Sequence, residues 1–278
     1  MKRIGILHHP KLPQSQSLAQ EIAAWLAMHG VSPWQASAWD EALVEGEIGS
    51  LDLLITLGGD GTILRAARMG ACHGVPILGL NLGRLGFLAE LQPGDWQAPM
   101  GRLLEGDYWI EQRMMLHAEF LHNGECRRAF EALNDVVVSR GSLARIVRLT
   151  ASVDGGYLAT YAADGLIIAT ATGSTAYALA VGGPILPPQL HNILVIPIAP
   201  HLSLERAVVL AEGSTVSVAV STDHTAMLTI DGQFEVELQH EDTVIVKASP
   251  YRACFVRMQE STYFYRTLMA RLRPAGYE

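Results

Sequence analysis

One short segment, Gly58-Gly59-Asp60-Gly61-Thr62, has the residue types that phosphate chemistry requires. Glycines permit positive φ angles and let a ligand approach the backbone without a Cβ in the way. A helix that starts after such a loop offers free N–H groups and the positive end of its dipole to an anion. A carboxylate is a poor phosphate ligand, so we expect Asp60 to act on a hydroxyl group or a metal ion. The alternative is that Asp60 only caps the helix that follows.

The segment matches neither of two common nucleotide-binding motifs. A P-loop needs Lys and then Ser or Thr after its last glycine, and Gly61-Thr62-Ile63 contains no Lys. The dinucleotide motif G-x-G-x-x-G also fails, because residues 59–64 read GDGTIL. The loop therefore indicates phosphate handling of another kind.

Further polar residues stand at the ends of predicted strands in the second half of the chain. Asn134 and Asp135 precede a run of valines, and Asp164 precedes the apolar strand 166–170. Residues 172–184 read TGSTAYALAVGGP, a hydroxyl-rich helix start followed by a glycine stop. Small hydroxyl side chains at a helix start can donate to a phosphate, a ribose or an adenine, and they are equally consistent with an ordinary helix cap.

Two differently patterned halves must position these residues. In the first, strands alternate with helices, which predicts an open parallel, Rossmann-like α/β sheet that binds ligands at the carboxyl ends of its strands. Its predicted strands are 3–7, 51–57 and 75–80, and its predicted helices are 17–29 and 95–104. A further glycine-rich connection, residues 81–87, would lie near the first loop.

From about residue 108 the pattern becomes strand-like, which predicts a second, mostly antiparallel β domain. Asn123-Gly124, Asp154-Gly155 and Asp231-Gly232 are expected to be hairpin turns. The predicted strands are Met114–Leu121, Arg128–Ser139, Ile146–Val153, Tyr157–Ala162, Leu166–Thr170, Ile193–Ile198, Thr215–Val220, Ala226–Ile230, Phe234–Leu238 and Thr243–Ala248. A C-terminal helix, Glu260–Leu272, is expected to return to the first domain. The predicted domains are residues 1–100 with 257–278, and residues 101–256.

Composition narrows the class of protein. The 278 residues are 49% hydrophobic and 17% charged, as in folded globular proteins. A net charge of −8 argues against nucleic acid or an anionic membrane as the main partner. Three widely spaced cysteines, with no signal-peptide or transmembrane pattern, lead us to expect a cytoplasmic protein.

Taken together, the segments resemble the bacterial and archaeal NAD kinases. The matching segments, in order, are GGDGT 58–62, NLGRLGF 81–87, NDVVVSR 134–140, ADG 163–165, TGSTAYALAVGGP 172–184, IAPH 198–201 and DGQ 231–233. GGDGT alone marks a broader superfamily that includes phosphofructokinases and diacylglycerol and sphingosine kinases. The resemblance implies transfer of the ATP γ-phosphoryl group to the 2′-hydroxyl of the adenosine ribose of NAD. It also implies NADP as product, a divalent metal ion such as Mg²⁺, and a homodimer or homotetramer.

The resemblance also implies a role for each matching residue. Asp60 is the catalytic carboxylate, the base that orients the 2′-hydroxyl. The NAD-binding residues are Asp60, Gly61, Arg65, Phe87, Asn134, Asp135, Arg145, Asp164, Thr175, Ala176, Tyr177, Ala180 and Gln233. The residues for the ATP phosphates are Gly58, Gly59, Thr62 and Gly183. No metal ligand is assigned.

Within that set, parts of the dinucleotide are assigned to particular residues. Asn134 and Asp135 are expected at the ribose on the nicotinamide side, and Asp164 at the nicotinamide amide. Phe87 is expected against the adenine. The segment 175–177 is expected to surround the adenine and its ribose, although Tyr177 is equally consistent with a core aromatic.

Departures from the family pattern and alternative functions stay open at this point. Asp135 stands where many members have Glu, Ala180-Val181 replaces a frequent Ser-Ala pair, and Ala199 replaces a frequent Cys. One alternative is a lipid or sphingoid-base kinase, and another is a dinucleotide-binding regulator without catalysis. The sequence does not decide whether polyphosphate replaces ATP, whether NADH is accepted, or whether NADP(H) inhibits.

Overall fold

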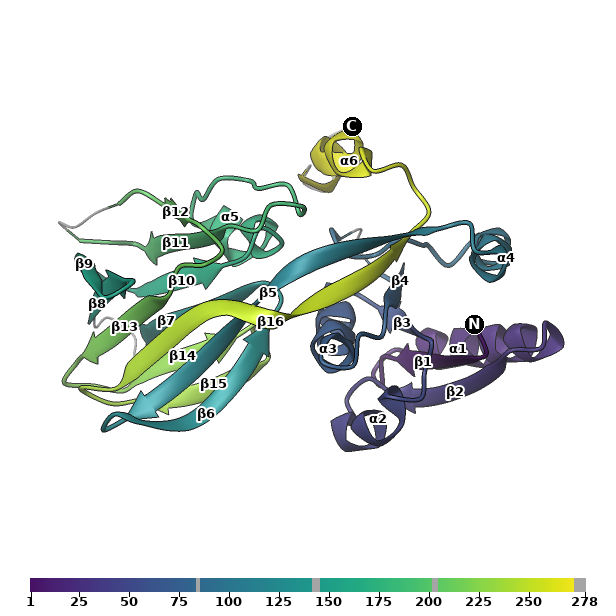
Figure 1. Cartoon of the computed structure of the whole chain (residues 1–278), viewed down its shortest axis with the longest axis horizontal. Helices are drawn as coiled ribbons and strands as arrows, with labels where there is room; N and C mark the ends of the chain where they lie inside the picture. Colours follow the sequence, from purple (N-terminus) through teal and green to yellow (C-terminus); the bar gives the residue numbers. More distant parts are fainter. Residues whose placement is uncertain (84–85, 142–145, 202–204, 273–278) are drawn as a thin grey trace. The chain divides into compact units, whose positions relative to one another are not determined.

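The computed structural model describes residues 1–83, 86–141, 146–201 and 205–272. It divides into two compact units, Met1–Gln112 with Arg252–Glu278, and Arg113–Tyr251. The long strands β5 (Trp109–His122) and β16 (Thr243–Arg257) have residues in both units (Figure 1). The limits predicted from the sequence do not coincide with this division, because the chain changes unit within these two strands.

The first unit is an open sheet of parallel strands in the order β2-β1-β3-β4-β16, which confirms the predicted Rossmann-like class. The predicted C-terminal helix, α6 (Tyr263–Leu272), belongs to this unit. Its other elements are β1 (Arg3–His8), α1 (Pro13–Met28), β2 (Ser32–Ser37), α2 (Glu41–Ile48), β3 (Leu53–Gly58), α3 (Asp60–Ala71), β4 (Ile77–Asn81) and α4 (Gln97–Glu105) (Figure 1). Helix α2 was not expected from its polar sequence.

The strand order places a topological switch point between β1 and β3. The chain leaves β1 toward β2 on one side, and β3 then pairs with β1 on the other. Helix α1 packs on one face of the sheet, with Ile22 against the side that carries Ile6 and Ile55. Helix α3 contacts β3 and β4 from the other side. In open α/β sheets ligands bind outside the carboxyl ends of the strands at such a point, and the GGDG loop follows β3 there.

The second unit is built from antiparallel strands, as predicted. One sheet has the order β12-β11-β10-β7-β14-β15, and β9-β8-β13-β16 and the β5–β6 hairpin form the other. Apolar side chains from both sheets form one core. The bounds are β6 (Glu125–Ala132), β7 (Asp135–Arg140), β8 (Val147–Val153), β9 (Gly156–Ala163), β10 (Gly165–Ala169), β11 (Ile193–Ile198), β12 (Val208–Leu210), β13 (Val216–Ser221), β14 (Ala226–Ile230) and β15 (Phe234–Leu238).

The three predicted hairpin turns are confirmed. Both central residues of Asn123-Gly124, Asp154-Gly155 and Asp231-Gly232 have positive φ, as a type I′ turn requires. Asn or Asp followed by Gly is favoured in all three turns because these residues tolerate positive φ better than others do. Among the residues whose structure is described, no helix is long and apolar enough to cross a membrane.

One predicted strand is wrong in detail. The predicted strand Arg128–Ser139 is two strands, β6 and β7, in different sheets. The break falls where the side-chain oxygens of Asp231 accept hydrogen bonds from the backbone N–H groups of residues 133–135. The helix predicted within residues 172–184 is confirmed as α5 (Tyr177–Ala180), which a 3₁₀ turn, Gly173–Thr175, precedes.

Candidate active site

The GGDG loop turns directly from β3 into α3. Gly59 is the N-cap and Asp60 the first helical residue. We expected positive φ angles in this loop, but neither Gly58, Gly59 nor Gly61 has one. A Cβ on Gly58 would lie 2.2 Å from Thr62 Oγ1, whereas a Cβ on Gly59 or Gly61 would meet nothing within 4 Å. Gly58 is therefore required for packing, and the other two glycines leave the helix N-terminus open to an anion.

The Asp60 carboxylate is held by Gly86 and Phe87 of the further glycine-rich connection, residues 81–87, which is called the second glycine-rich loop below. Its Oδ2 accepts the backbone N–H of Phe87 at 3.0 Å. A Cβ on Gly86 would lie 2.2 Å from both carboxylate oxygens, so only glycine fits beside them. The backbone of Leu82 also donates to the Gly58 carbonyl at 3.1 Å, which joins the two loops. Asp60 is thus oriented by a tertiary contact, and Gly59 occupies the capping position that the alternative gave to Asp60.

Two predicted ligand residues have other contacts in this unit. The side chain of Thr62 is 1% exposed and packs against Gly58. Arg65 Nη1 lies 2.7 Å from Glu41 Oε1, and its guanidinium stacks 4.7 Å from the centre of the Trp39 ring. The Arg65 guanidinium is thus engaged within the protein, whereas the buried Thr62 Oγ1 has no hydrogen-bond partner among the described residues. Their predicted contacts with ATP phosphate and with NAD stay predictions.

In the second unit, Asp231 organises the segment that begins β7. Its Oδ1 accepts the backbone N–H groups of Asn134 at 2.8 Å and of Asp135 at 3.0 Å. The Thr170 hydroxyl donates to the Leu133 carbonyl at 2.6 Å and accepts the Gly173 N–H at 3.1 Å. These bonds bring the predicted NDVVV and TGST segments together.

Gly173 permits the close approach of those two segments. A Cβ at this position would lie 2.0 Å from the backbone oxygen of Asn134. Backbone atoms cannot give way as a flexible side chain can, so the position requires glycine. The glycine of TGST is therefore explained by packing.

A cavity of about 320 Å³ opens beside these segments. It is lined by Asn134, Asp135, Val137, Ser139, Ala176, Tyr177, Thr229, Asp231 and Gly232. Four predicted NAD-binding residues therefore share one cavity, with a volume suited to part of a nucleotide. Tyr177 is 45% exposed, so the alternative that it is a core aromatic is wrong.

Asp135 is the buried carboxyl group of this cavity. Burial raises its pKa to about 7, with a further contribution from the negative charge of Asp231. Asp231 and Tyr177 are the titratable side chains that line the cavity with it, and the described lining residues include no Lys, Arg or His. Near neutral pH Asp135 therefore exists in both protonation states, and it can donate to or accept from a ribose hydroxyl.

Replacement of Asp135 by Asn is expected to stabilise the fold at pH 8 more than at pH 5. The folded state holds a proton that the unfolded chain releases, so the free energy of unfolding of the unsubstituted chain falls as pH rises from 3.8 to about 7. At about 1.4 kcal/mol for each pH unit of that window, the ionised group costs up to a few kcal/mol at pH 8. Thermal unfolding at both pH values measures the difference.

The matched control for this experiment is Asp95→Asn, because the Asp95 side chain is exposed to solvent. It should change the melting temperature equally at the two pH values. An Asp135→Asn variant that behaved like this control would contradict the assigned pKa.

Other predicted residues lie outside the described lining of the cavity. Asp164 Oδ1 lies 2.8 Å from Arg140 Nε, in an ion pair. Gly183 is required by packing, because a Cβ would lie 2.7 Å from the Ala178 carbonyl oxygen. Ala180 is exposed, and Gln233 ends the turn after β14. Arg145 lies outside the described residues. The contacts of these residues with NAD or ATP stay predictions.

Sequence reasoning missed Ser139 and Thr229 in the cavity, and the part of Thr170 in joining the predicted segments. A signal for Ser139 was present, since alternation along a strand places it on the same face as Asp135 and Val137. Thr170 acts through contacts with a distant segment, which no local pattern reveals. Gly86 was expected near the first loop as part of residues 81–87, and the structure adds its close approach to the Asp60 carboxylate.

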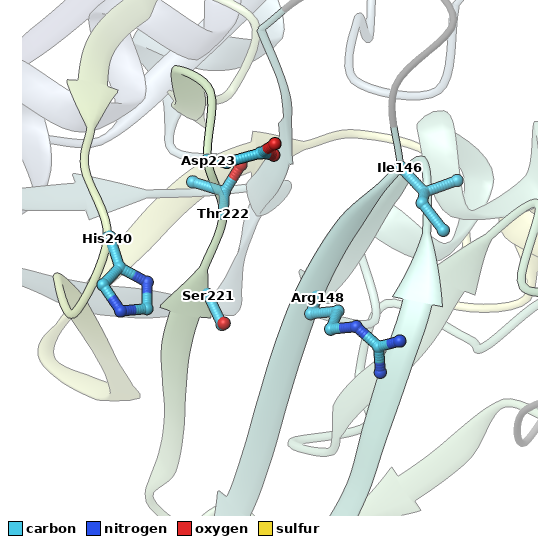
Figure 2. Close-up of a pocket in the computed structure, with 6 residues that line it drawn as sticks. All are labelled: Ile146, Arg148, Ser221, Thr222, Asp223 and His240. Carbon is cyan, nitrogen blue, oxygen red and sulfur yellow. The ribbon is translucent and has the colours of Figure 1, made fainter.

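A second cavity, of about 580 Å³, lies on the strands β8 and β13, and its described lining contains none of the predicted residues. Figure 2 shows its side chains, Ile146, Arg148, Ser221, Thr222, Asp223 and His240. They do not converge on one point, and the His240 side chain is 60% exposed. The smaller cavity, with its buried carboxyl and its aromatic ring, is the better candidate for a binding site.

These features define a class of protein. A parallel α/β unit carries a fixed carboxylate in a glycine loop at the switch point. An antiparallel unit carries an acidic, aromatic cavity. Together they are the features of a two-domain phosphotransferase that acts on a nucleotide.

The comparisons with known proteins specify the class. Family models described as the ATP-NAD kinase N-terminal and C-terminal domains match residues 16–108 and 133–258. The chain is 40% identical over 273 residues to an NAD kinase of Dehalococcoides mccartyi, covering 98% of this chain and 96% of the relative. It is 39% identical to an NAD kinase of Chloroflexus aurantiacus, covering 98% and 99%. The chain belongs to the ATP-NAD kinase family.

Solved structures share the fold. A yeast NADH kinase complexed with NADH has a TM-score of 0.84 and 23% identity, covering all of this chain and 89% of the other. An Archaeoglobus fulgidus NAD kinase in complex with ATP has a TM-score of 0.80 and 25% identity, covering 97% and 98%. As a member of the family, the chain is an enzyme that phosphorylates NAD to NADP with ATP.

Proposed function

We propose that Asp60 is the general base of this reaction, acting on the 2′-hydroxyl of the adenosine ribose. The observation that carries the proposal is a carboxylate fixed by the Phe87 N–H at the start of α3, beside two glycines with open space around them. In the proposed step the 2′-oxygen bonds to the γ-phosphorus while the bond from that phosphorus to the β,γ-bridging oxygen breaks. Asp60 takes the hydroxyl proton, and ADP leaves with the electron pair.

A carboxylate is a sufficient base for this step because phosphoryl transfer does not require full deprotonation of the attacking hydroxyl. The transition state is loose, so the hydroxyl needs little deprotonation before it attacks, and catalysis rests on positioning and charge stabilisation. General base catalysis typically contributes about 10²–10⁴ in rate. Asp60 meets the positioning requirement because the second loop fixes its orientation.

We propose that the cavity of the second unit binds part of the dinucleotide. Asp135, with Asn134, would hold ribose hydroxyls, and the half-exposed ring of Tyr177 would pack on a base or a ribose. The acidic lining of the cavity supports this role, since it provides acceptors for hydroxyl groups and contains no described cation for a phosphate. The shorter carboxylate at position 135 keeps the charge of the Glu found in many members.

The donor phosphates are assigned to the N-terminus of α3. Gly59 and Gly61 leave free approach there, and the helix dipole favours an anion. A divalent ion such as Mg²⁺ would arrive with ATP, held mainly by phosphate oxygens and water, and would neutralise the developing charge. Asp60 is the carboxylate in this loop that such an ion would meet. Polyphosphate as donor, a homodimer or homotetramer, and a cytoplasmic location stay predictions.

The test of the function is formation of NADP from NAD, ATP and Mg²⁺, followed with an NADP-specific dehydrogenase. Turnover of NAD supports the proposal. Phosphorylation of a diacylglycerol or a sphingoid base without NAD turnover would contradict it and favour the lipid-kinase alternative. Binding of NAD without turnover would favour the regulator.

Replacement of Tyr177 by Ala is expected to weaken NAD binding about tenfold while leaving the fold intact. An aromatic contact of this kind contributes about 1 kcal/mol beyond its buried area, and Tyr177 is 45% exposed in the absence of ligand. Calorimetric titration of NAD measures the change, and thermal unfolding checks the fold. Tyr157→Ala is the control, since Tyr157 is 70% exposed and lies outside the cavity. Native affinity in Tyr177→Ala would contradict the assignment.

A further inference from the structure

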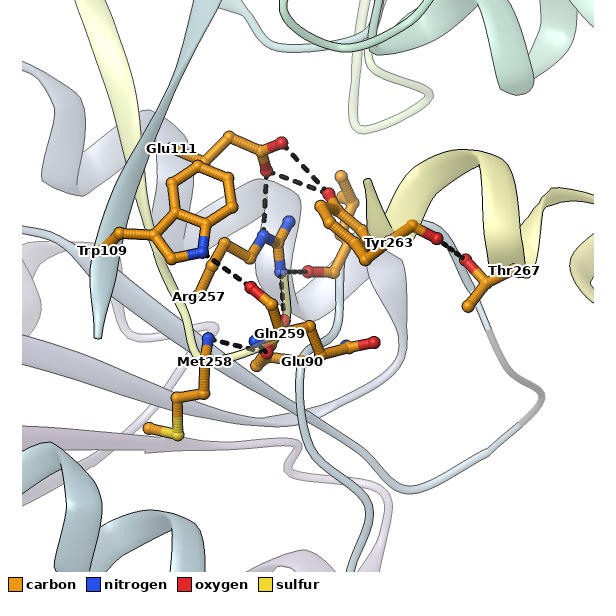
Figure 3. A network of polar contacts seen from close by, with 9 residues as sticks. Glu90, Trp109, Glu111, Arg257, Met258, Gln259, Tyr263 and Thr267 are labelled. Carbon is orange, nitrogen blue, oxygen red and sulfur yellow. Dashed lines mark hydrogen bonds and ion pairs between the residues drawn. The ribbon is translucent and has the colours of Figure 1, made fainter. Parts of the chain in front are cut away.

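A buried ionic network joins the C-terminal end of β16 to residues 88–90, which directly follow the second glycine-rich loop (Figure 3). The Arg257 side chain is fully buried, and its Nε donates to Glu111 Oε2 at 2.9 Å. Its Nη1 donates to the Leu88 carbonyl at 2.9 Å and to Glu90 Oε2 at 3.3 Å. Although burial opposes the charge, Tyr263 and the two carboxylates hold the pKa of Arg257 above its usual value. The guanidinium is therefore cationic at any working pH.

Helix α6 completes the network from the other side. The Tyr263 hydroxyl donates to Glu111 at 3.0 Å, and the Arg257 guanidinium lies 5.1 Å from the centre of the Tyr263 ring. Glu90 Oε1 accepts the backbone N–H groups of Met258 at 2.9 Å and Gln259 at 3.0 Å. Backbone and side-chain bonds thus hold residues 88–90, β5, the end of β16 and the start of α6 in one arrangement.

The network ends one residue away from the contact that orients Asp60. Arg257 fixes the carbonyl of Leu88, and the N–H of the preceding residue, Phe87, is the donor to Asp60 Oδ2. The Phe87 ring also lies 6.4 Å from the ring of Phe264 in α6. Only the Cα atoms of Phe87 and Leu88 and the peptide bond between them separate the Leu88 carbonyl from the Phe87 N–H, so anchoring the carbonyl restricts the positions open to the N–H.

Stability alone is a poor explanation of the buried charges. Taking a guanidinium and carboxylates out of water is costly, and apolar residues of similar volume are often as stabilising or more so. A buried network of this kind does fix geometry, because each bond has a required direction. Here the network fixes the position of the second glycine-rich loop, whose Phe87 N–H donates to Asp60.

We propose that Arg257, held by Glu111 and Tyr263, is a positioning residue for the phosphoryl-transfer step. It sets the place of the Phe87 N–H and thereby the orientation of the Asp60 carboxylate. The inference rests on the proposed role of Asp60 as base. It assigns a part in catalysis to Arg257 and Tyr263, which lie far from the Asp60 carboxylate in sequence.

The test is a double-mutant cycle in the full-length chain. Arg257→Lys keeps the positive charge but removes the forked guanidinium that donates to Leu88 and Glu111 together. This variant should lower kcat by about 10- to 100-fold and leave KM for NAD within about threefold of native. Tyr263→Phe removes only the hydroxyl and should lower kcat less, by about threefold. In an Asp60→Asn background both substitutions should have little further effect, because the group that they orient no longer acts.

A core control separates positioning from general loss of stability. Ile22→Val removes one methyl group between α1 and the sheet, away from the network. Its effect on kcat, if any, should be the same in the otherwise unsubstituted chain and in the Asp60→Asn background. Equal effects of Arg257→Lys or Tyr263→Phe in the two backgrounds, or an unchanged kcat, would overturn the proposal. If Arg257→Lys does not fold, the Tyr263→Phe cycle decides.

A second readout needs no activity. Hydrogen exchange at the Phe87 amide should be faster in Tyr263→Phe and Arg257→Lys than in the unsubstituted chain, and unchanged in Ile22→Val. Native exchange at Phe87 in both network variants would overturn the proposal. Absence of NADP formation by the unsubstituted chain would instead contradict the proposed function, and exchange at Phe87 would still report whether the network holds the loop.

Discussion

Replacement of Asp60 by Asn is expected to lower kcat about 10³-fold and to leave the affinity for NAD within about threefold of native. The amide oxygen of Asn can still accept the Phe87 N–H, so the contact that orients the side chain survives. The amide cannot take a proton from the 2′-hydroxyl, so the base is lost while the geometry is kept. Steady-state kinetics of NADP formation and calorimetric titration of NAD measure the two effects separately.

Asp40→Asn is the matched control in the same unit. Asp40 caps α2 by accepting the Leu43 N–H, and Asn caps a helix equally well. This variant should keep native kinetics. If Asp60→Asn retained a native rate, or lost binding as much as turnover, Asp60 would not be the base.

The second large effect is expected at a residue with no side chain of its own. Gly86→Ala should lower kcat by about 10²-fold, because the new Cβ would lie 2.2 Å from both Asp60 oxygens and the carboxylate must turn away. The atoms that must move belong to one short side chain, so the fold should survive with a melting temperature within a few degrees of native. Kinetics with thermal unfolding on the same sample test both statements.

Gly83→Ala provides the comparison within the same loop, since a Cβ at Gly83 would meet nothing within 4 Å. It should leave kcat unchanged. A Gly86→Ala variant with native kcat would show that the position of the Asp60 carboxylate is not critical. A Gly86→Ala variant that failed to fold would show that rotation of the Asp60 side chain is not enough to accommodate the new Cβ.

Parts of the site could be predicted because their signals are local. Gly59 and Asp60 stand between a buried strand and a helix start, and this order of elements by itself predicts an anion site. Asn134 and Tyr177 were predicted through family motifs, and the structure places both at one cavity. What those motifs did not reveal is how they are joined, through the Thr170 hydroxyl.

Other parts could not be predicted because their cause lies far along the chain. The break between β6 and β7 is made by Asp231, 97 residues from Asn134, and the local pattern of residues 128–139 does not reveal that contact. Arg65 has the right type for a charge contact with the dinucleotide, and only the structure shows that Glu41 and Trp39 also contact its guanidinium. A residue type states what a side chain can do, and its neighbours decide what it does.

The sequence by itself determined the features that depend on neighbouring residues. It determined the strand, glycine loop and helix around Asp60, the hairpin turns of Asn or Asp with Gly, and membership of the kinase family. Backbone sterics and hydrogen bonding within a few residues are sufficient to specify such local structures.

Only the tertiary structure decided how the chemical groups are tuned and aimed. The pKa of Asp135 near 7 follows from burial beside Asp231, and the orientation of Asp60 follows from Phe87 in the second loop. Arg257 reaches the carbonyl of Leu88 across 169 residues of sequence. The physical reason is that desolvation and hydrogen-bond direction depend on which distant segments pack together, and packing is a property of the whole fold.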